Sequence, residues 1–355
     1  MINTDALIFD IDGTLWDTTK LCATAWNKAI EGAGFKDAAT ITADRLKGLF
    51  GLTMDVIADA VLPEMSADKR KALLSDCIFL EQKILSDNTE DLSYEGIADV
   101  IKELSSYLPV CIASNSQAGY PELVIKKLGL SGYIFDHICF GDTGFEKDAN
   151  IRLLCEKWGF KSAVYIGDIQ KDMDAAVKAG AAFIHAAYGF GTAKDPDAVI
   201  KSPRDILSVI SFDKKSETDI RDELIKKALD MRAFSYAPYS DYQVGAALLT
   251  AGGRIYTGCN VENASYGAAN CAERTAVFKA VSEGMLRFKA IAIAGGSGSK
   301  MGMAYPCGIC RQVLREFSDP SELKIYVASS LSEYMEYTLE ELLPESFGPD
   351  FKSSL

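Results

Sequence analysis

Near the start of the 355-residue chain, residues 6–14 read ALIFDIDGT. Four apolar residues of strand length are followed at once by two aspartates and a glycine. Because side chains alternate along an extended chain, Asp10 and Asp12 can point to the same side. Gly13 permits a sharp turn at the end of the strand. The stretch therefore predicts a buried strand that presents two carboxylates where it ends.

Two further apolar runs of strand length, Val110–Ala113 and Val164–Ile166, are each followed by small or polar residues and then by helical spacing. Alternation of strands and helices predicts a parallel sheet with helices on both faces. Residues 18–85 lie between the first two strands and show amphipathic helical patterns with little strand signal. We therefore predict an α/β fold class for residues 1–210, a Rossmann-like parallel sheet with a helical cap at about residues 18–85.

The later strands also end in polar residues. Ser114 and Asn115 end the second strand, and Asp168 and Asp172 follow the third. Lys147 begins a helical segment between them. In open α/β sheets, ligands bind at the carboxyl ends of the parallel strands. The sequence therefore predicts a ligand site at this edge of the sheet.

Taken in order, these motifs resemble those of the haloacid dehalogenase-like phosphatases, and most of all the phosphoglycolate phosphatase and β-phosphoglucomutase group. The resemblance implies that Asp10 is the nucleophile that forms an aspartyl-phosphate and that Asp12 is the general acid and base. It also implies that Ser114, Asn115 and Lys147 bind the phosphoryl group. Stabilising the charge of the transferring phosphoryl group is the main requirement of such chemistry.

The same resemblance implies a Mg²⁺ site. Asp10, Asp168 and the backbone carbonyl of Asp12 would hold the ion, with Asp172 in support. One position departs from the family pattern, because Asp148 follows the motif lysine where proline is usual. That change leaves the charge of the lysine intact but puts the geometry of the loop in question.

The C-terminal part contains a second set of candidate ligands. Cys271-Ala272-Glu273 is followed by Cys307 and Cys310 in C-x-x-C spacing. Three thiolates leave one tetrahedral position on Zn²⁺ for water, which is typical of a catalytic site. Three thiolates and one Zn²⁺ carry a net negative charge that Arg274 could offset. A structural zinc knuckle is the alternative, but it does not require a glutamate two residues after a ligand.

The cysteine pattern matches the zinc nucleobase deaminase signature, in which a conserved glutamate acts as general acid and base. Around it, four segments resemble the short three-cysteine cytidine deaminases, over essentially all of residues 217–350. They are SYAPYS at 235–240, VGAAL at 244–248, GCNVENA at 258–264 and CAER at 271–274. The resemblance implies an α/β/α cytidine deaminase sandwich over residues 218–355, with Glu273 as the acid–base residue.

The resemblance also assigns residues to substrate binding. Asn260 and Glu262 would hold the ribose hydroxyls, and Tyr242 falls where the ring-stacking aromatic residue, usually Phe, is expected. Ala272 would also contact the substrate. Phe347 lies in a tail that resembles the one with which the family lends an aromatic residue to a neighbouring subunit, so a homotetramer is implied.

Composition limits the partners and the compartment. The net charge of −13 repels polyanions, which argues against nucleic acid or an anionic membrane as a partner. The first five residues lack the features of a signal peptide, and no apolar stretch approaches the length of a membrane span. Nine scattered cysteines do not suggest a disulfide framework. We expect a cytoplasmic protein with a linker at 211–217.

The leading hypothesis is a bifunctional hydrolase of pyrimidine salvage that acts on small molecules. Its phosphatase would prefer pyrimidine nucleoside monophosphates such as CMP and dCMP, with Trp26 and Phe50 as candidates for contacts to the base. The alternative keeps the deaminase and makes the phosphatase act on phosphoglycolate or a sugar phosphate. A nucleic-acid cytosine deaminase is disfavoured by the acidic composition and by the Asn260 and Glu262 pair.

Overall fold

The computed structural model describes residues 1–35, 40–213 and 215–349. Residues 36–39 of the predicted cap, Lys214 of the predicted linker and residues 350–355 of the predicted deaminase domain lie outside the described residues. The chain divides into two compact units, one made of residues 1–130 and 134–213 and the other of residues 131–133 and the residues from 214 on. No helix in the described part of the chain is both long and apolar enough to span a bilayer.

The first unit is built on a six-stranded parallel sheet. In spatial order its strands are β4 (Asp136–Cys139), β3 (Val110–Ser114), β2 (Ala6–Phe9), β5 (Ala163–Gly167), β6 (Ala182–Ala186) and β7 (Ala198–Ile200). The three strands predicted from apolar runs are confirmed, and they are the central ones. Strand β2 is completely buried, as its unbroken apolar sequence requires.

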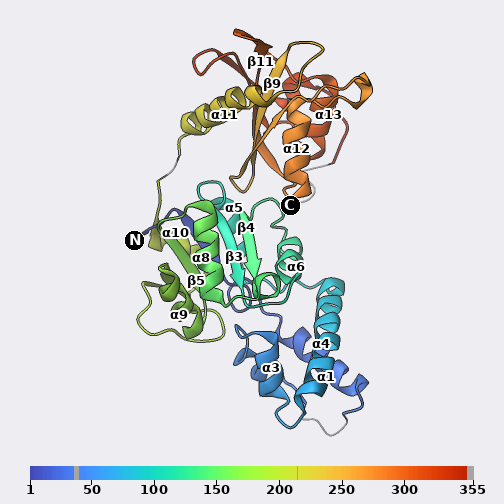
Figure 1. Ribbon diagram of the computed structural model, residues 1–355. Helices are drawn as coiled ribbons and strands as arrows, with labels where there is room; N and C mark the ends of the chain where they lie inside the picture. Colours follow the sequence, from blue (N-terminus) through green and yellow to red (C-terminus); the bar gives the residue numbers. More distant parts are fainter. Residues whose placement is uncertain (36–39, 214, 350–355) are drawn as a thin grey trace. The chain divides into compact units, whose positions relative to one another are not determined.

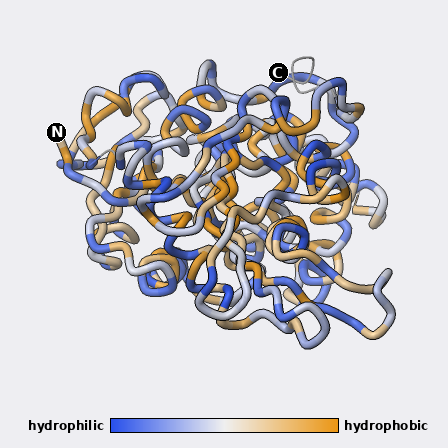
Figure 2. The backbone as a smooth tube through the Cα atoms, turned by 90° about the horizontal axis from the view of Figure 1, so that it is seen from above, coloured by the Kyte–Doolittle hydropathy of each residue, from blue (hydrophilic) through white to orange (hydrophobic). Residues whose placement is uncertain are grey.

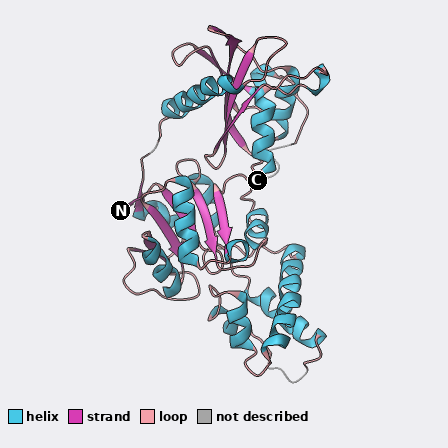
Figure 3. Ribbon diagram, in the orientation of Figure 1, coloured by secondary structure: helices cyan, strands magenta, loops and turns pink. Residues whose placement is uncertain are grey.

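Each face of this sheet has its own hydrophobic core. Leu7 and Phe9 of β2 belong to one cluster of buried residues, and Ala6 and Ile8 belong to the other. The period of two along a strand produces this division. Short apolar and polar runs alternate along the whole backbone (Figure 2), as expected for strands and amphipathic helices. The predicted covering of both faces by helices is confirmed (Figure 3).

The helices of the first unit fall into two groups. Those beside the sheet are α5 (Ile97–Leu104), α6 (Tyr120–Lys127), α7 (Phe140–Thr143), α8 (Lys147–Trp158), α9 (Gln170–Ala179) and α10 (Ile206–Val209). Those of the cap are α1 (Thr19–Gly32), α2 (Ala43–Lys47), α3 (Met54–Val61) and α4 (Ala67–Asp87). The arrowheads of the strands point toward the cap helices (Figure 1). The cap therefore lies at the edge of the sheet where the polar strand ends are.

Regular secondary structure includes both ends of the predicted linker. Ser211 belongs to the short strand β8 (Ile210–Ser211), which pairs in parallel with β1 (Ile2–Asn3). At the other end, the Ser216 hydroxyl accepts a hydrogen bond from the backbone N–H of Asp219 and so caps the helix that begins at Glu217. Regular structure thus extends into the predicted linker from both sides.

The second unit has a mixed six-stranded sheet. Its main path is β10 (Ile255–Cys259), β9 (Gln243–Thr250), β11 (Phe288–Ser297), β13 (Lys324–Ala328) and β14 (Tyr334–Thr338), and β12 (Lys300–Gly302) pairs with β11. Only β11 and β13 run parallel. The helices are α11 (Glu217–Met231), α12 (Ala272–Ser282), α13 (Gly308–Glu316) and α14 (Leu339–Leu342).

This sheet also separates two cores. Leu248 of β9 packs in one cluster with Val277 of α12, whereas Ala247 packs in the other with Leu224 and Ala228 of α11. Helices therefore cover both faces, which confirms the predicted α/β/α sandwich. Short 3₁₀ helices lie at Pro203–Asp205 in the first unit and at Arg232–Phe234 and Tyr266–Ala268 in the second.

A glycine fixes how closely α12 approaches the sheet. A Cβ atom at Gly258 in β10 would lie 2.4 Å from the carbonyl oxygen of Ala272 and 2.5 Å from the backbone nitrogen of Ala276. Such distances are too short for any side chain, so only glycine allows the first turn of α12 to rest on β10. Because Cys271 immediately precedes this helix, the contact also positions a predicted zinc ligand.

Candidate active sites

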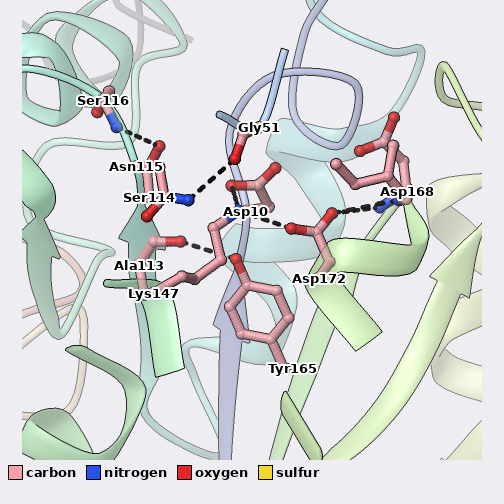
Figure 4. A network of polar contacts seen from close by, with 11 residues as sticks. Asp10, Gly51, Ala113, Ser114, Asn115, Ser116, Lys147, Tyr165, Asp168 and Asp172 are labelled. Carbon is pink, nitrogen blue, oxygen red and sulfur yellow. Dashed lines mark hydrogen bonds and ion pairs between the residues drawn. The ribbon is translucent and has the colours of Figure 1, made fainter. Parts of the chain in front are cut away.

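The strand ends of the first unit bring together three predicted aspartates and the predicted lysine. Asp10 follows β2, Asp168 and Asp172 follow β5, and Lys147 is the first residue of α8. The Lys147 Nζ lies 2.8 Å from Oδ1 of Asp10 and 2.6 Å from Oδ1 of Asp172 (Figure 4). All four side chains are buried. Residues far apart in the sequence thus form one charged cluster.

The composition of this cluster fits a divalent cation. Carboxylate oxygens of Asp10, Asp168 and Asp172 lie within 4.8 Å of one another, and oxygen ligands are those that Mg²⁺ prefers. When ionised, the three carboxylates and the ammonium of Lys147 carry two net negative charges, which one divalent ion balances. Burial raises the pKa of Asp10 and that of Asp168, and a cation bound between them would favour the ionised form of both.

Asp172 differs from the other two aspartates in its contacts. Its Oδ2 accepts hydrogen bonds from the backbone N–H groups of Asp168 and Ile169, at 3.1 and 3.2 Å, while Oδ1 binds Lys147. Both of its oxygens are therefore already engaged with protein groups. Asp172 shapes the turn between β5 and α9 and orients Lys147.

The carboxylate of Asp12 lies outside the metal-binding group. Its Oδ1 accepts hydrogen bonds from the hydroxyl groups of Tyr120, at 2.7 Å, and Thr18, at 3.1 Å. Burial raises its pKa to about 6 despite these bonds. This geometry agrees with a metal contact through the backbone carbonyl alone and leaves the carboxyl group to exchange protons. Neither Tyr120 nor Thr18 was singled out from the sequence.

The residues after β3 connect the sheet to the cap. The Ser114 Oγ is buried and accepts a hydrogen bond from the backbone N–H of Ser116. The Asn115 Nδ2 donates to the carbonyl oxygen of Gly51, 2.9 Å away in the cap (Figure 4). Asn115 therefore links the end of β3 directly to the cap.

The replacement of proline by Asp148 does not displace the lysine. Helix α8 still begins at Lys147, and Asp148 pairs with Arg152 one turn later at 2.7 Å. An acidic residue in the first turn also suits the positive end of the helix. The ring of Tyr165 lies beside this lysine, with its centroid 5.7 Å from the Lys147 Nζ. No sequence motif marked Tyr165 as part of the site.

In the second unit, the three predicted cysteines come together. Their sulfur atoms lie within 4.8 Å of one another, and those of Cys271 and Cys307 are 3.9 Å apart. A tetrahedral zinc with Zn–S bonds of about 2.3 Å places sulfurs about 3.8 Å apart. The three thiols therefore fit Zn²⁺. Cys271 precedes α12 and Cys307 precedes α13, so two helix N-termini stabilise the thiolates.

Neighbouring groups favour ionisation of the Cys271 thiol. A hydrogen bond from Cys310, followed by the nearby guanidinium of Arg274, lowers the pKa of Cys271 to about 5. The Arg274 Nη2 lies 3.6 Å from the Cys271 Sγ and 3.1 Å from the carbonyl oxygen of Ala269. Arg274 therefore lies beside a predicted zinc ligand, where its positive charge can offset that of the thiolates. Glu273 is buried beside them, and burial raises its pKa to about 7.

A cavity of about 510 Å³ opens beside the cysteines. Five predicted substrate or catalytic residues line it, namely Tyr242, Asn260, Glu262, Ala272 and Glu273. Cys271, Arg274 and Cys307 also line it, as do Tyr266, Met303 and Tyr305, which lie in no recognised motif. Phe347 is not among the lining residues, and it is 79% exposed. A single chain thus assembles the whole predicted site except this aromatic residue.

Asn260 and Glu262 also organise the wall of the cavity. The Asn260 side chain accepts a hydrogen bond from the backbone N–H of Val244 and donates one to the carbonyl oxygen of Tyr242, both at 2.8 Å. Glu262 accepts from the backbone N–H of Tyr239 at 2.9 Å. Each side chain keeps lone pairs for a ligand, because a carboxylate or amide oxygen can accept more than one hydrogen bond.

Comparison with known proteins identifies both units. The model of the haloacid dehalogenase-like hydrolases matches residues 7–186, and that of the cytidine and deoxycytidylate deaminase zinc-binding region matches residues 218–326. The chain is 49% identical over 127 residues to a cytidine deaminase of Halalkalibacterium halodurans, which covers 36% of this chain and 93% of the relative. It is 44% identical over 129 residues to a cytidine deaminase of Sporosarcina psychrophila, covering 36% and 92%.

The first unit also has a similar solved structure. The similarity to a predicted phosphoglycolate phosphatase from Haemophilus somnus covers 58% of this chain and 97% of that protein's chain, with a TM-score of 0.52 and 20% identity. At this level of identity, the comparison shows a shared fold only. The chain belongs to the haloacid dehalogenase-like hydrolases and, through its second unit, to the cytidine deaminases. It is an enzyme that joins both domains, and its cofactors are Mg²⁺ and Zn²⁺.

Replacing Cys307 by Ala should abolish zinc binding and destabilise the second unit, because two thiolates cannot complete the ligand set. Metal analysis of the purified protein should show about one zinc per chain in the wild type and close to none in the variant. Cys259→Ala is the matched control, since Cys259 lies outside the three-sulfur group and its Sγ contacts the carbonyl oxygen of Phe234. Full zinc occupancy in Cys307→Ala would contradict the assignment.

Proposed function

We propose that the second unit deaminates cytidine and deoxycytidine to the corresponding uracil nucleosides. The observation that carries this proposal is the position of Glu273. It is a buried carboxyl group in the first turn of α12, two residues after Cys271, and it lines the same cavity as the zinc-binding sulfurs. A zinc site that only stabilises the fold does not require a buried carboxyl group beside the metal. Asn260 and Glu262 support a nucleoside as the substrate.

The chemistry follows from these positions. A zinc ion held by the three thiolates supplies the acidity that lets water act as a nucleophile near neutral pH. Glu273 accepts a proton from that water and delivers it to the ring nitrogen. The oxygen adds to the carbon that bears the amino group, Glu273 takes the remaining proton from this oxygen and passes it to the amine, and the C–N bond breaks, so that ammonia leaves and a carbonyl group forms. The pKa of about 7 suits a residue that must both accept and donate.

Glu273→Gln should retain zinc but lose turnover of cytidine by about 10²-fold or more, because an amide cannot carry protons. Ammonia release and metal content, measured on the same preparation, separate the two effects. Glu316→Gln removes an exposed carboxylate at the end of α13 and should leave both unchanged. Activity of Glu273→Gln within a few-fold of the wild type would show that another group carries the protons.

We propose that the first unit hydrolyses a phosphomonoester in the presence of Mg²⁺. Asp10 attacks phosphorus, the P–O bond of the ester breaks, and Asp12 gives its proton to the leaving oxygen. Asp12 then takes a proton from water, which attacks the aspartyl-phosphate and releases phosphate. The separate hydrogen-bonding of Asp12 to Tyr120 and Thr18, away from the charged cluster, supports this division of roles. Ser114, Asn115 and Lys147 bind the phosphoryl oxygens.

For the physiological substrate, we propose pyrimidine nucleoside monophosphates, in cytoplasmic salvage of pyrimidines, because the fused deaminase would consume the product. Phe50 lines the cavity beside Asp10, whereas Trp26 does not line it. That cavity measures about 30 Å³, room for water-sized ligands only, so a nucleoside requires the hydrogen bond between Asn115 and Gly51 to open. Phosphoglycolate and sugar phosphates are the competing candidates.

Asp10→Asn should abolish phosphate release while cytidine deamination stays within about twofold, because the two sites use different residues and metals. The assay compares CMP, dCMP, phosphoglycolate and glucose 1-phosphate with Mg²⁺. A tenfold higher kcat/KM for either non-nucleotide, equal to about 1.4 kcal/mol, would rule out the salvage substrate. Loss of both activities in Asp10→Asn would contradict independent sites.

We further propose a homotetramer in which Phe347 completes the site of a neighbouring subunit. The support is that large apolar side chains of the second unit remain in water in the single chain, with Phe234, Tyr266, Ile309 and Phe347 each more than 60% exposed. Phe347→Ala should raise KM for cytidine about tenfold with zinc retained. The control is Met335→Ala, at an exposed residue of β14. A monomer in light scattering would refute the proposal.

A further inference from the structure

The cap contributes a buried carboxyl group that the proposed phosphatase chemistry does not use. Glu81 lies in α4 and is 4% exposed. Its Oε1 accepts a hydrogen bond from the Nε1 of Trp26 at 2.6 Å. Glu81 also lines the small cavity beside Asp10, to which the cap contributes one side. It therefore borders the space next to the phosphoryl site, where the leaving group of an ester must lie.

Acidic side chains line the cavity, and no basic ones do so in the described part of the chain. The acidic residues are Asp10, Asp12 and Glu81. Burial raises the pKa of Glu81 to about 8, so this carboxyl group is largely protonated at neutral pH, in a part of the cavity that disfavours negative charge. A carboxylate on the leaving group would enter here without a counter-ion and would lose its hydration.

The same cavity offers hydrogen bonds to an uncharged ligand. The Asn115 Oδ1 and the Ser116 Oγ are buried and have no hydrogen-bond partner among the described residues. Both residues line the cavity, and Phe50 and Leu52 add apolar surface from the cap. Buried polar atoms usually find a partner, so these two indicate a bound group that is polar. Glu81 keeps further lone pairs beside the one that Trp26 uses.

We propose that Glu81 is a specificity-determining residue of the phosphatase site. It hydrogen-bonds a hydroxyl or amino group of an uncharged leaving group, and it occupies a position where a carboxylate-bearing leaving group would need a cation. The selected class is the phosphate esters of neutral alcohols, nucleosides and sugars included, and the excluded class contains phosphoglycolate. This inference rests on the phosphatase activity proposed above.

The test compares three substrates on the full chain with Mg²⁺: CMP, phosphoglycolate and phenyl phosphate, whose leaving group has no further polar group. The wild type should prefer CMP to phosphoglycolate by at least about tenfold in kcat/KM. In Glu81→Gln the amide oxygen still accepts from Trp26, but an NH₂ group, which only donates, replaces a carboxyl O–H group, which can both donate and accept. The CMP-to-phosphoglycolate ratio should fall by about tenfold, mainly through KM, while phenyl phosphate changes less than about threefold.

Asp76→Asn is the matched control, because it removes an exposed carboxylate from the same helix, away from the cavity. It should keep the wild-type ratio. An equal or higher kcat/KM for phosphoglycolate in the wild type, or an unchanged ratio in Glu81→Gln, overturns the role of Glu81 alone. Failure to hydrolyse even phenyl phosphate overturns the phosphatase activity, and the role of Glu81 with it.

Discussion

The buried ion pairs of Lys147 are the interaction on which the first unit depends. This ammonium is 4% exposed and touches two carboxylates that are themselves buried, from Asp10 and Asp172. Losing one partner of such a pair leaves an uncompensated charge in the interior, which typically costs about 3–5 kcal/mol. The ends of β2 and β5 and the start of α8 are therefore held in register by charge as well as by the apolar cores on either side of the sheet. Once the neighbouring carboxylate of Asp168 is included, two negative charges are left over, which one divalent cation would balance.

The second unit must also compensate a cluster of negative charge, but it does so with different groups. Its negative charge belongs to thiolates, and the compensation comes from the N-termini of α12 and α13 and from Arg274. Close packing makes this arrangement possible, since only a glycine at position 258 lets α12 begin against β10. In both units, a carboxyl group remains beside the compensated cluster: the half-buried Asp12 in one and the buried Glu273 in the other. Each lies outside its ligand group and is left to move protons.

Features encoded locally in the sequence could be predicted. The strand at Ala6–Phe9 and the helices after Cys271 and Cys307 have the expected positions, because apolar runs and metal-ligand spacing act over a few residues. The partners of these sites could not be predicted in the same way. Tyr120 lies 108 residues from Asp12 and carries no motif, so only the fold reveals their hydrogen bond. Trp26 was a candidate for contacts to a base, yet it is 1% exposed and donates to Glu81 instead.

The burial of Glu81 could not be predicted from the sequence, and the stability of the cap does not explain why a carboxyl group stands at this position. In an amphipathic helix, a glutamate is expected to face solvent, and nothing near it in the sequence marks it as buried. A glutamine could accept the hydrogen bond of Trp26 equally well, without the cost of burying an ionisable group. A carboxyl group at this position is therefore better accounted for by the ligand that enters the cavity than by the packing of the cap.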